Sequence, residues 1–222
     1  AMITCVKNMT KGMVKYQGKE TLDGLKNQSA TDDYCYFVAG VVGEMLTEIF
    51  TDYGQQWEQS KKNILKEHAV SFGQGLQMTN ILKDIWADRA RGACWLPKDL
   101  FDKENIELRK MMNGKYRGFE KCLNILIGRT LFHLNNALKY SLAIPKQEKG
   151  IRIFCLWALF MAAFTLRKIH KNQIFLEGIE VKISRRSVFL TAWITKLLVK
   201  SDFALKVVFL LVTAPLPKAK QD

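Results

Sequence analysis

The sequence predicts a single all-α domain, and three observations support this fold class. Helical periodicity of apolar residues runs through most of the 222 residues, while the alternation typical of strands is nearly absent. Proline is scarce, with four residues, and none of them lies inside a predicted helix. Hydrophobic residues make up 48% and charged residues 25% of the chain, which excludes a disordered, collagen-like or disulfide-scaffold protein.

The helices follow one another with short connections. A first helix precedes a polar linker over residues 17–31, and Thr31, Asp32 and Asp33 then supply cap and first-turn residues for the next helix. A longer helix ends near Arg91 and Gly92, ahead of Pro97. The predicted long helices cover residues 34–50, 61–90, 118–144, 151–171 and 186–200.

The C-terminal segment differs from the rest of the chain. We divide the sequence into an all-α domain over residues 1–202 and an apolar segment with a basic tail over residues 203–222. The run 203–214 is apolar apart from Lys206, and Lys218 and Lys220 follow it. Twelve residues are too few to span a bilayer, so the run is a final core helix, the favoured interpretation, or lies in a membrane interface.

Charge is unevenly distributed, which narrows the expected partners. Residues 1–110 hold 15 basic and 15 acidic side chains, whereas residues 111–222 hold 19 basic and 6 acidic ones, so the whole net charge of +13 lies there. We expect an anionic membrane surface as partner and a cytoplasmic protein peripheral to the membrane. Nucleic acid is disfavoured because the basic residues are dispersed and no nucleic-acid motif is present. The oligomeric state stays open.

Other compositional features exclude several kinds of site. The five cysteines are odd in number and widely spaced, which indicates reduced, buried thiols. The three histidines form no metal-binding pair. We find no signal peptide and no run of about 18–20 apolar residues that would span a membrane.

The strongest chemical signal is a set of polar residues within the 61–90 helix. Spacings of three, four and four residues place these side chains on one helix face. The two carboxylates repel each other unless a cation lies between them, and oxygen ligands of this kind suit Mg²⁺. The alternative is a solvated face in which the carboxylates pair with Lys83 or Arg91. The set consists of Gln77, Asn80, Asp84 and Asp88.

A second signal lies at the start of the 34–50 helix. Ala39, Gly40 and Gly43 are small residues in a helical segment, where each glycine costs about 1 kcal/mol relative to alanine. Small residues at this spacing allow a neighbouring helix or a ligand chain to approach the backbone. Tyr34 lies on the same stripe, one turn before Val38. The alternative is close helix packing with a core tyrosine.

Together these segments resemble the squalene/phytoene synthase family. Residues 34–43 resemble its YC-x-x-x-AG-x-x-G segment, and residues 73–88 with Leu96-Pro97 resemble its second aspartate-rich segment and the loop after it. The resemblance runs from about Cys5 to Arg186, and Lys11-Gly12-Met13 is nearer to squalene than to phytoene synthases.

The resemblance implies an isoprenoid-synthase-type helical bundle around an apolar cavity, and head-to-head condensation of two prenyl (farnesyl) diphosphates to a squalene-type product. Mg²⁺ would assist ionisation of the diphosphate, with NADPH as a second cofactor. The implied metal ligands are Asp84 and Asp88, with Tyr34, Gln77 and Asn80 as catalytic residues. Implied substrate contacts are Val38, Ala39, Val42, Gly43, Leu76, Phe154, Lys83 and Arg91, and implied cofactor contacts are Lys182 and Arg185.

Departures from the family pattern keep alternatives open. Ala87 stands where the family has Glu, Lys83 replaces an Arg, and Ala93 follows Gly92 where an Arg is usual. The family's first aspartate-rich helix is expected upstream of Cys5, and no second D-x-x-x-D occurs in the chain. We therefore expect an N-terminally truncated domain that is inactive alone. The alternatives are a non-enzymatic scaffold of the same fold, and a phytoene or dehydrosqualene synthase.

Overall fold

A computed structural model describes residues 1–17 and 21–218, and its elements are helical apart from one isolated β-bridge between Leu25 and Pro97. The helices are α1 (Met2–Tyr16), α2 (Gln28–Cys35), α3 (Val41–Tyr53), α4 (Gln59–Lys83), α5 (Ile85–Ala90), α6 (Lys98–Asp102), α7 (Phe119–Ala143), α8 (Lys149–Lys171), α9 (Gly178–Val181), α10 (Arg185–Leu198) and α11 (Asp202–Thr213). A short π-helix covers Tyr36–Gly40 and a 3-10 helix covers Leu108–Lys110. The predicted all-α class is confirmed.

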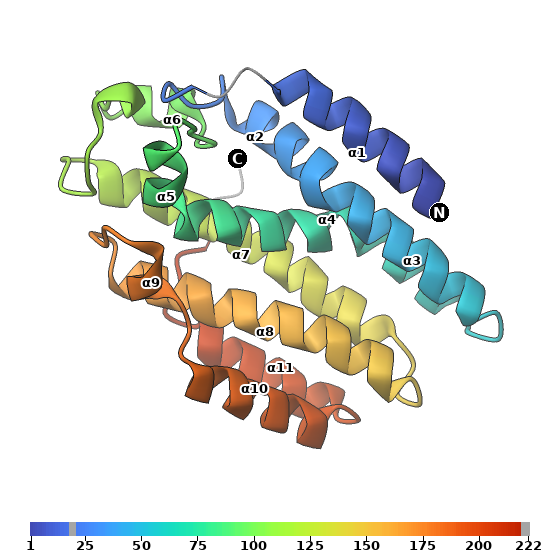
Figure 1. Ribbon diagram of the computed structural model, residues 1–222. Helices are drawn as coiled ribbons and strands as arrows, with labels where there is room; N and C mark the ends of the chain where they lie inside the picture. The colour runs from blue at the N-terminus through green and yellow to red at the C-terminus, as the bar shows by residue number, and fades with distance from the viewer. Residues whose placement is uncertain (18–20, 219–222) are drawn as a thin grey trace.

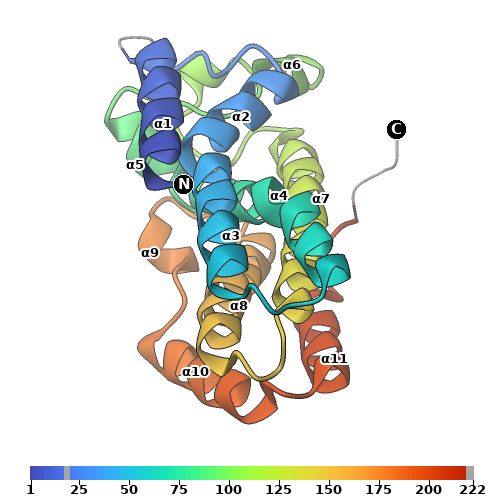
Figure 2. The ribbon, with the colours of Figure 1, turned by 90° about the vertical axis from the view of Figure 1, so that its right-hand side faces the viewer.

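The bundle is organised around α4, α7 and α8. Helix α4 packs against α3 and along α7, while α8 packs against α4 and α7 on one side and against α10 and α11 on the other (Figure 1). Turning the molecule shows α1 to α3 covering the opposite side of this central group (Figure 2). One large core of buried side chains runs from Tyr16 in α1 to Leu216 after α11.

The start of the second helical stretch was placed too late by the sequence. Its N-cap is Asn27, whose Oδ1 accepts a hydrogen bond from the backbone N–H of Ala30 at 3.0 Å. Thr31 is therefore not a cap but a buried residue inside α2. The polar linker ends four residues earlier than predicted. An asparagine cap uses the same chemistry as a threonine cap, so composition alone did not distinguish the two positions.

The predicted helix over residues 61–90 is interrupted at Asp84. Helix α4 ends at Lys83, Asp84 adopts φ −103° and ψ 13°, and α5 continues from Ile85. Backbone hydrogen bonds still cross the break, because Asp84 N–H donates to Asn80 O at 2.9 Å and Asp88 N–H donates to Asp84 O at 2.8 Å. The continuous helix predicted for this segment is thus corrected to two helices that meet at Asp84.

Close packing explains the small residues of the second stretch. A side chain at Gly43 would bring a Cβ within 2.1 Å of Ala69 O, and one at Gly73 would come within 2.1 Å of Ala39 O. Each glycine therefore lets the α2–α3 stretch and α4 cross with their backbones nearly touching. Gly43 and Ala39 belong to this crossing.

The C-terminal helix shares the core of the bundle. Leu205, Phe209 and Val212 of α11 are buried in the same cluster as α8, which agrees with the favoured interpretation of a final core helix. The division of the chain at residue 203 stays a prediction, and Lys220 of the basic tail lies outside the described residues.

One sequence expectation about membrane spans needs correction. Helix α8 is long and apolar enough to cross a membrane by length and composition, with a mean hydropathy of 1.6 over its best window. Half of that stretch is buried inside the bundle, where α8 packs against α4, α7, α9, α10 and α11. A central helix of a helical bundle has the same composition, because its neighbours take the place of lipid.

All five cysteines are buried free thiols, as predicted. Burial raises the pKa of the Cys155 thiol to about 12, so this sulfur stays protonated and unreactive at neutral pH.

Candidate functional site

A pocket of about 540 Å³ lies where α4 and α5 meet, and we call it the carboxylate pocket. It contains all seven polar or charged residues of the central motifs that the sequence singled out for metal, catalytic or diphosphate roles. Its lining consists of Tyr34, Gln77, Asn80, Ile81, Lys83, Asp84, Asp88, Arg91, Ala93 and Trp95.

Each carboxylate of the pocket has a cationic neighbour. Lys83 Nζ lies 2.9 Å from Asp84 Oδ2, and the Arg91 guanidinium donates to Asp88 Oδ1. Burial raises the pKa of Asp88, Asp84 raises it further, and the bond from Arg91 opposes both without cancelling them. The side chain of Asp88 is only 15% exposed, so the pairing expected for a solvated surface occurs here inside a concave site.

Tyr34 is held in the pocket wall by aromatic contacts. Its ring stacks on Trp95 with centroids 4.1 Å apart and planes 8° apart, and Tyr16 packs edge-on at 5.2 Å. The Trp95 loop is fixed to the linker, because Leu25 N–H donates to Leu96 O at 2.9 Å and Lys98 N–H donates to Leu25 O at 2.7 Å. These contacts hold the Tyr34 ring in one orientation in the pocket wall.

Sequence reasoning missed Trp95 and Gly178. Trp95 directly precedes Leu96-Pro97 of the loop motif, so its position beside a motif was the available signal. Gly178 begins α9, and a Cβ there would lie 3.1 Å from Lys83 O and 3.2 Å from Asp84 Oδ1. The contact of Gly178 with Lys83 and Asp84 joins segments far apart in the sequence, and no local sequence pattern predicts it.

The donor set fits a magnesium ion that is shared with a substrate. Asp84, Asp88 and the amides of Gln77 and Asn80 offer oxygen ligands on one pocket, and Mg²⁺ takes one or two carboxylates together with water and phosphate oxygens. The described residues hold no group of three or more His, Cys, Asp or Glu side chains that would enclose a metal by themselves. The pocket therefore suits a metal completed by a diphosphate, and not a site closed by protein ligands.

A second hollow adjoins the first, and Asp84 lines both. This α9 pocket measures about 560 Å³ and contains Lys182, one of the two predicted cofactor contacts, together with Lys83 and the Trp86 indole. Arg185, the other predicted contact, is an exposed residue that opens α10 and is not among the lining residues of this pocket.

The predicted substrate-chain residues lie elsewhere. Val38 and Leu76 are partly buried and pack against the main core, whereas the side chain of Phe154 on α8 is 55% exposed. Val42 is half-buried on α3, next to Gly43 at the helix crossing. The structure does not bring these apolar residues into the carboxylate pocket.

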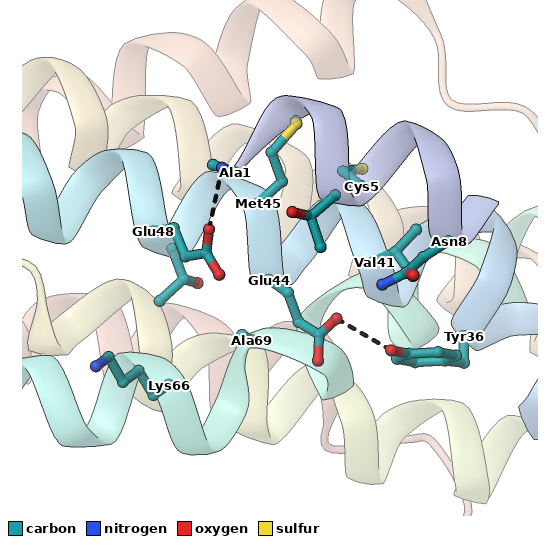
Figure 3. A pocket seen from close by; sticks show the side chains of 12 residues that line it. Ala1, Cys5, Asn8, Tyr36, Val41, Glu44, Met45, Glu48, Lys66 and Ala69 are labelled. Atoms are coloured by element: carbon teal, nitrogen blue, oxygen red, sulfur yellow. Dashed lines mark hydrogen bonds and ion pairs between the residues drawn. The ribbon is translucent and has the colours of Figure 1, made fainter. Parts of the chain in front are cut away.

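A third hollow, of about 480 Å³, lies between α1, α3 and α4 (Figure 3). Glu44 and Glu48 of α3 point into it, and Tyr36 Oη donates to Glu44 Oε2 at 3.1 Å. Burial and the Glu44 carboxylate raise the pKa of Tyr36, which keeps this phenol neutral. Two glutamates, the Ala1 ammonium and Lys66 line this hollow, and Ala1 N lies 3.5 Å from Glu48 Oε2.

The bundle has the all-α isoprenoid synthase fold. A solved structure described as "The complex structure of TcSQS with ligand, E5700" superposes with a TM-score of 0.72 at 22% identity, over 96% of this chain and 60% of that one. A second complex of TcSQS, with ligand BPH1237, gives the same TM-score of 0.72 at 21% identity.

The chain belongs to the squalene/phytoene synthase family, whose model matches residues 1–187. Squalene synthase ERG9 of Candida albicans is 31% identical over 185 residues, which cover 80% of this chain and 40% of that protein. Squalene synthase of Cyberlindnera jadinii is 29% identical over 180 residues, again covering 40% of that protein. The chain thus spans about 40% of the length of these curated relatives.

Proposed function

We propose that this chain forms one diphosphate-binding half of an enzyme that condenses two farnesyl diphosphates head-to-head to a squalene-type product. The observation that carries the proposal is the convergence of Asp84, Asp88, Lys83, Arg91 and Tyr34 on one pocket. Kinship with squalene synthases supports the substrate class.

In the carboxylate pocket, the acidic and the basic side chains have different proposed roles. Asp84 and Asp88 would hold Mg²⁺, which when bound neutralises charge on the diphosphate leaving group. Lys83 and Arg91 pair with these carboxylates, and both cations would be able to contact diphosphate oxygens if the carboxylates held a metal. Tyr34, fixed by Trp95, lines the pocket and is the aromatic residue that would lie beside the allylic cation left after the C–O bond breaks.

The α9 pocket is our candidate for the second cofactor. Lys182 supplies positive charge for a phosphate group of NADPH, and Trp86 supplies an aromatic surface. The pocket shares Asp84 with the carboxylate pocket, so a reductant bound there lies next to the reacting centre.

Binding of a non-ionising farnesyl thiodiphosphate tests the proposal by calorimetry. We expect binding that requires Mg²⁺ and weakens at least about tenfold in Asp84→Asn, which equals about 1.4 kcal/mol. Asp102→Asn, which removes an exposed carboxylate on α6, is the matched control and should leave affinity unchanged. Incubation with farnesyl diphosphate, Mg²⁺ and NADPH should yield no squalene, because the chain has a single D-x-x-x-D pair.

A scaffold without catalysis is the second candidate, and the ion pairs favour it. Both carboxylates are already neutralised by Lys83 and Arg91, and Ala87 and Ala93 stand where the family has charged residues. A scaffold would bind the analogue equally with and without Mg²⁺, and Asp84→Asn would change nothing. A phytoene or dehydrosqualene synthase would instead give a product that NADPH does not alter when the full-length enzyme is assayed.

A further inference from the structure

Helix α10 exposes several large apolar side chains, while its threonines Thr191 and Thr195 are buried. Phe189 is 76%, Trp193 65%, Leu197 65% and Leu190 55% exposed. Spacings of three and four residues place these side chains on one stripe, which we call the α10 face. Monomeric soluble proteins rarely expose a continuous apolar stripe of this kind, so it marks a surface for a partner.

The opposite side of α10 is firmly attached to the bundle. Thr191 and Thr195 are buried there, and their hydroxyls donate to Ser187 O and Thr191 O at 2.7 Å. Trp157 Nε1 of α8 donates to Thr195 Oγ1 at 2.7 Å. The threonines face the bundle, so rotating the helix to turn its aromatic residues inward would break the bond between Trp157 and Thr195.

The charge around the α10 face is positive and almost unopposed. Residues 183–218 contain six lysines or arginines and a single acid, Asp202. Asp202 is itself neutralised, since Arg152 Nη2 lies 2.6 Å from its Oδ1 and Lys146 Nζ lies 3.3 Å from its Oδ2. Within residues 1–17 and 21–218, Arg186, Lys196 and Lys200 thus accompany the apolar stripe without an ion pair to an acidic side chain.

We propose that the α10 face is a docking surface for a membrane that contains anionic lipid. Aromatic and leucine side chains flanked by lysine and arginine suit the boundary between lipid headgroups and acyl chains. A second copy of the chain is a poorer occupant, because two such faces would bring like charges together. The α10 and α11 helices lie at the end of the molecule away from α1, α2 and α6, where a flat surface reaches them (Figures 1 and 2).

This inference differs from an attachment through the apolar run 203–214. The inner side of α11 belongs to the core, so deleting that run would disturb the fold and not only a surface. Most of α10 lies beyond residue 187, where the match to the family model ends.

Vesicle co-sedimentation of the full 222-residue chain tests the proposal without any prenyl substrate. We expect binding to phosphatidylcholine vesicles containing phosphatidylglycerol, and binding at least about tenfold weaker to phosphatidylcholine alone. Phe189→Ser with Trp193→Ser should weaken binding at least about tenfold. Tyr53→Ser with Phe132→Ser removes aromatics of similar exposure, 70% and 57%, and should have no effect.

A charge variant and a solution measurement complete the test. Lys196→Gln with Lys200→Gln should weaken binding to the anionic vesicles by about tenfold or more, whereas Lys103→Gln with Lys115→Gln should not. Equal binding to both vesicle types, or unchanged binding after loss of Phe189 and Trp193, overturns the proposal. A dimer that forms without lipid and dissociates in the Phe189→Ser with Trp193→Ser variant would also overturn the proposal, because a second copy would then cover the α10 face.

Discussion

The carboxylate of Asp33 links α1 to α2 and makes the stability of the fold depend on pH. It accepts hydrogen bonds from Lys15 Nζ and from Tyr16 Oη, the latter at 2.7 Å. Burial alone would raise the pKa of Asp33, but the bonds from Lys15 and Tyr16 outweigh burial and lower it. A carboxyl with a lowered pKa in the folded state stabilises the fold above the pKa of the unfolded chain, about 3.9.

Asp33→Asn should therefore lower the free energy of unfolding at pH 7, and this loss should shrink as the pH falls below about 4. The reason is that the wild-type carboxyl takes up a proton there and loses the same stabilisation. Urea unfolding at a series of pH values measures the difference. Lys15→Met removes the cation that pairs with the same carboxylate, so the pH dependence of the free energy of unfolding should become smaller. If the free energies of unfolding of wild type and Asp33→Asn differed equally at pH 3 and pH 7, the assignment of this pH dependence to Asp33 would be contradicted.

Single residues of the candidate site were predictable where chemistry follows spacing along the chain. Asp84, Asp88, Asn80 and Gln77 lie within three turns, and their common pocket follows from that local pattern. Trp95 and Gly178 were not predictable, because their contacts with Tyr34 and Asp84 depend on how distant segments meet.

At the scale of elements, the crossing of α4 with the α2–α3 stretch depends on glycine. In an open helix, replacing glycine by alanine stabilises by about 1 kcal/mol. At Gly73 the new methyl group would lie 2.1 Å from Ala39 O and 2.5 Å from Ala39 C, atoms of a neighbouring backbone that cannot rotate away. The helices must separate, so the sign of the effect is reversed.

Gly73→Ala should lower the free energy of unfolding by about 1–3 kcal/mol, the usual cost of overpacking. Gly150→Ala is the matched control, since Gly150 lies in the first turn of α8 with nothing within 4 Å of a Cβ. That control should stabilise by up to about 1 kcal/mol. Urea denaturation of both variants measures the two signs, and a destabilised control with an unaffected Gly73→Ala would refute the crossing argument.

Long helices with a regular apolar pattern were predicted well, whereas helix boundaries that depend on a single residue were not. Helices α7, α8 and α10 begin and end within two residues of their predicted bounds. The break at Asp84 was missed because the apolar pattern of α4 continues through α5, and a local change of backbone angle leaves that pattern intact. The early start of α2 was missed because two residues compete as caps.

At the scale of the whole molecule, Arg152 joins the C-terminal helices to the central group. Its side chain is fully buried on α8 and donates to Leu142 O and Ile144 O at the end of α7 at 3.1 and 2.6 Å. It also donates to Val199 O after α10 at 3.0 Å and to Asp202 Oδ1 of α11 at 2.6 Å. One guanidinium thus satisfies acceptors at the end of α7, just after α10 and at the start of α11.

Arg152→Met keeps much of the volume but leaves three buried carbonyls and one carboxylate without their donor. Removing one partner of a buried ion pair costs about 3–5 kcal/mol, so we expect a loss of about 3 kcal/mol, since Lys146 still pairs with Asp202. Thermal and urea unfolding measure the loss, and Arg152→Lys should recover only a small part because an ammonium lacks the planar fork. Arg186→Met, on an exposed side chain of α10, should change stability by less than about 0.5 kcal/mol. If Arg152→Met were as stable as Arg186→Met, the attachment of α10 and α11 would rest on apolar packing alone.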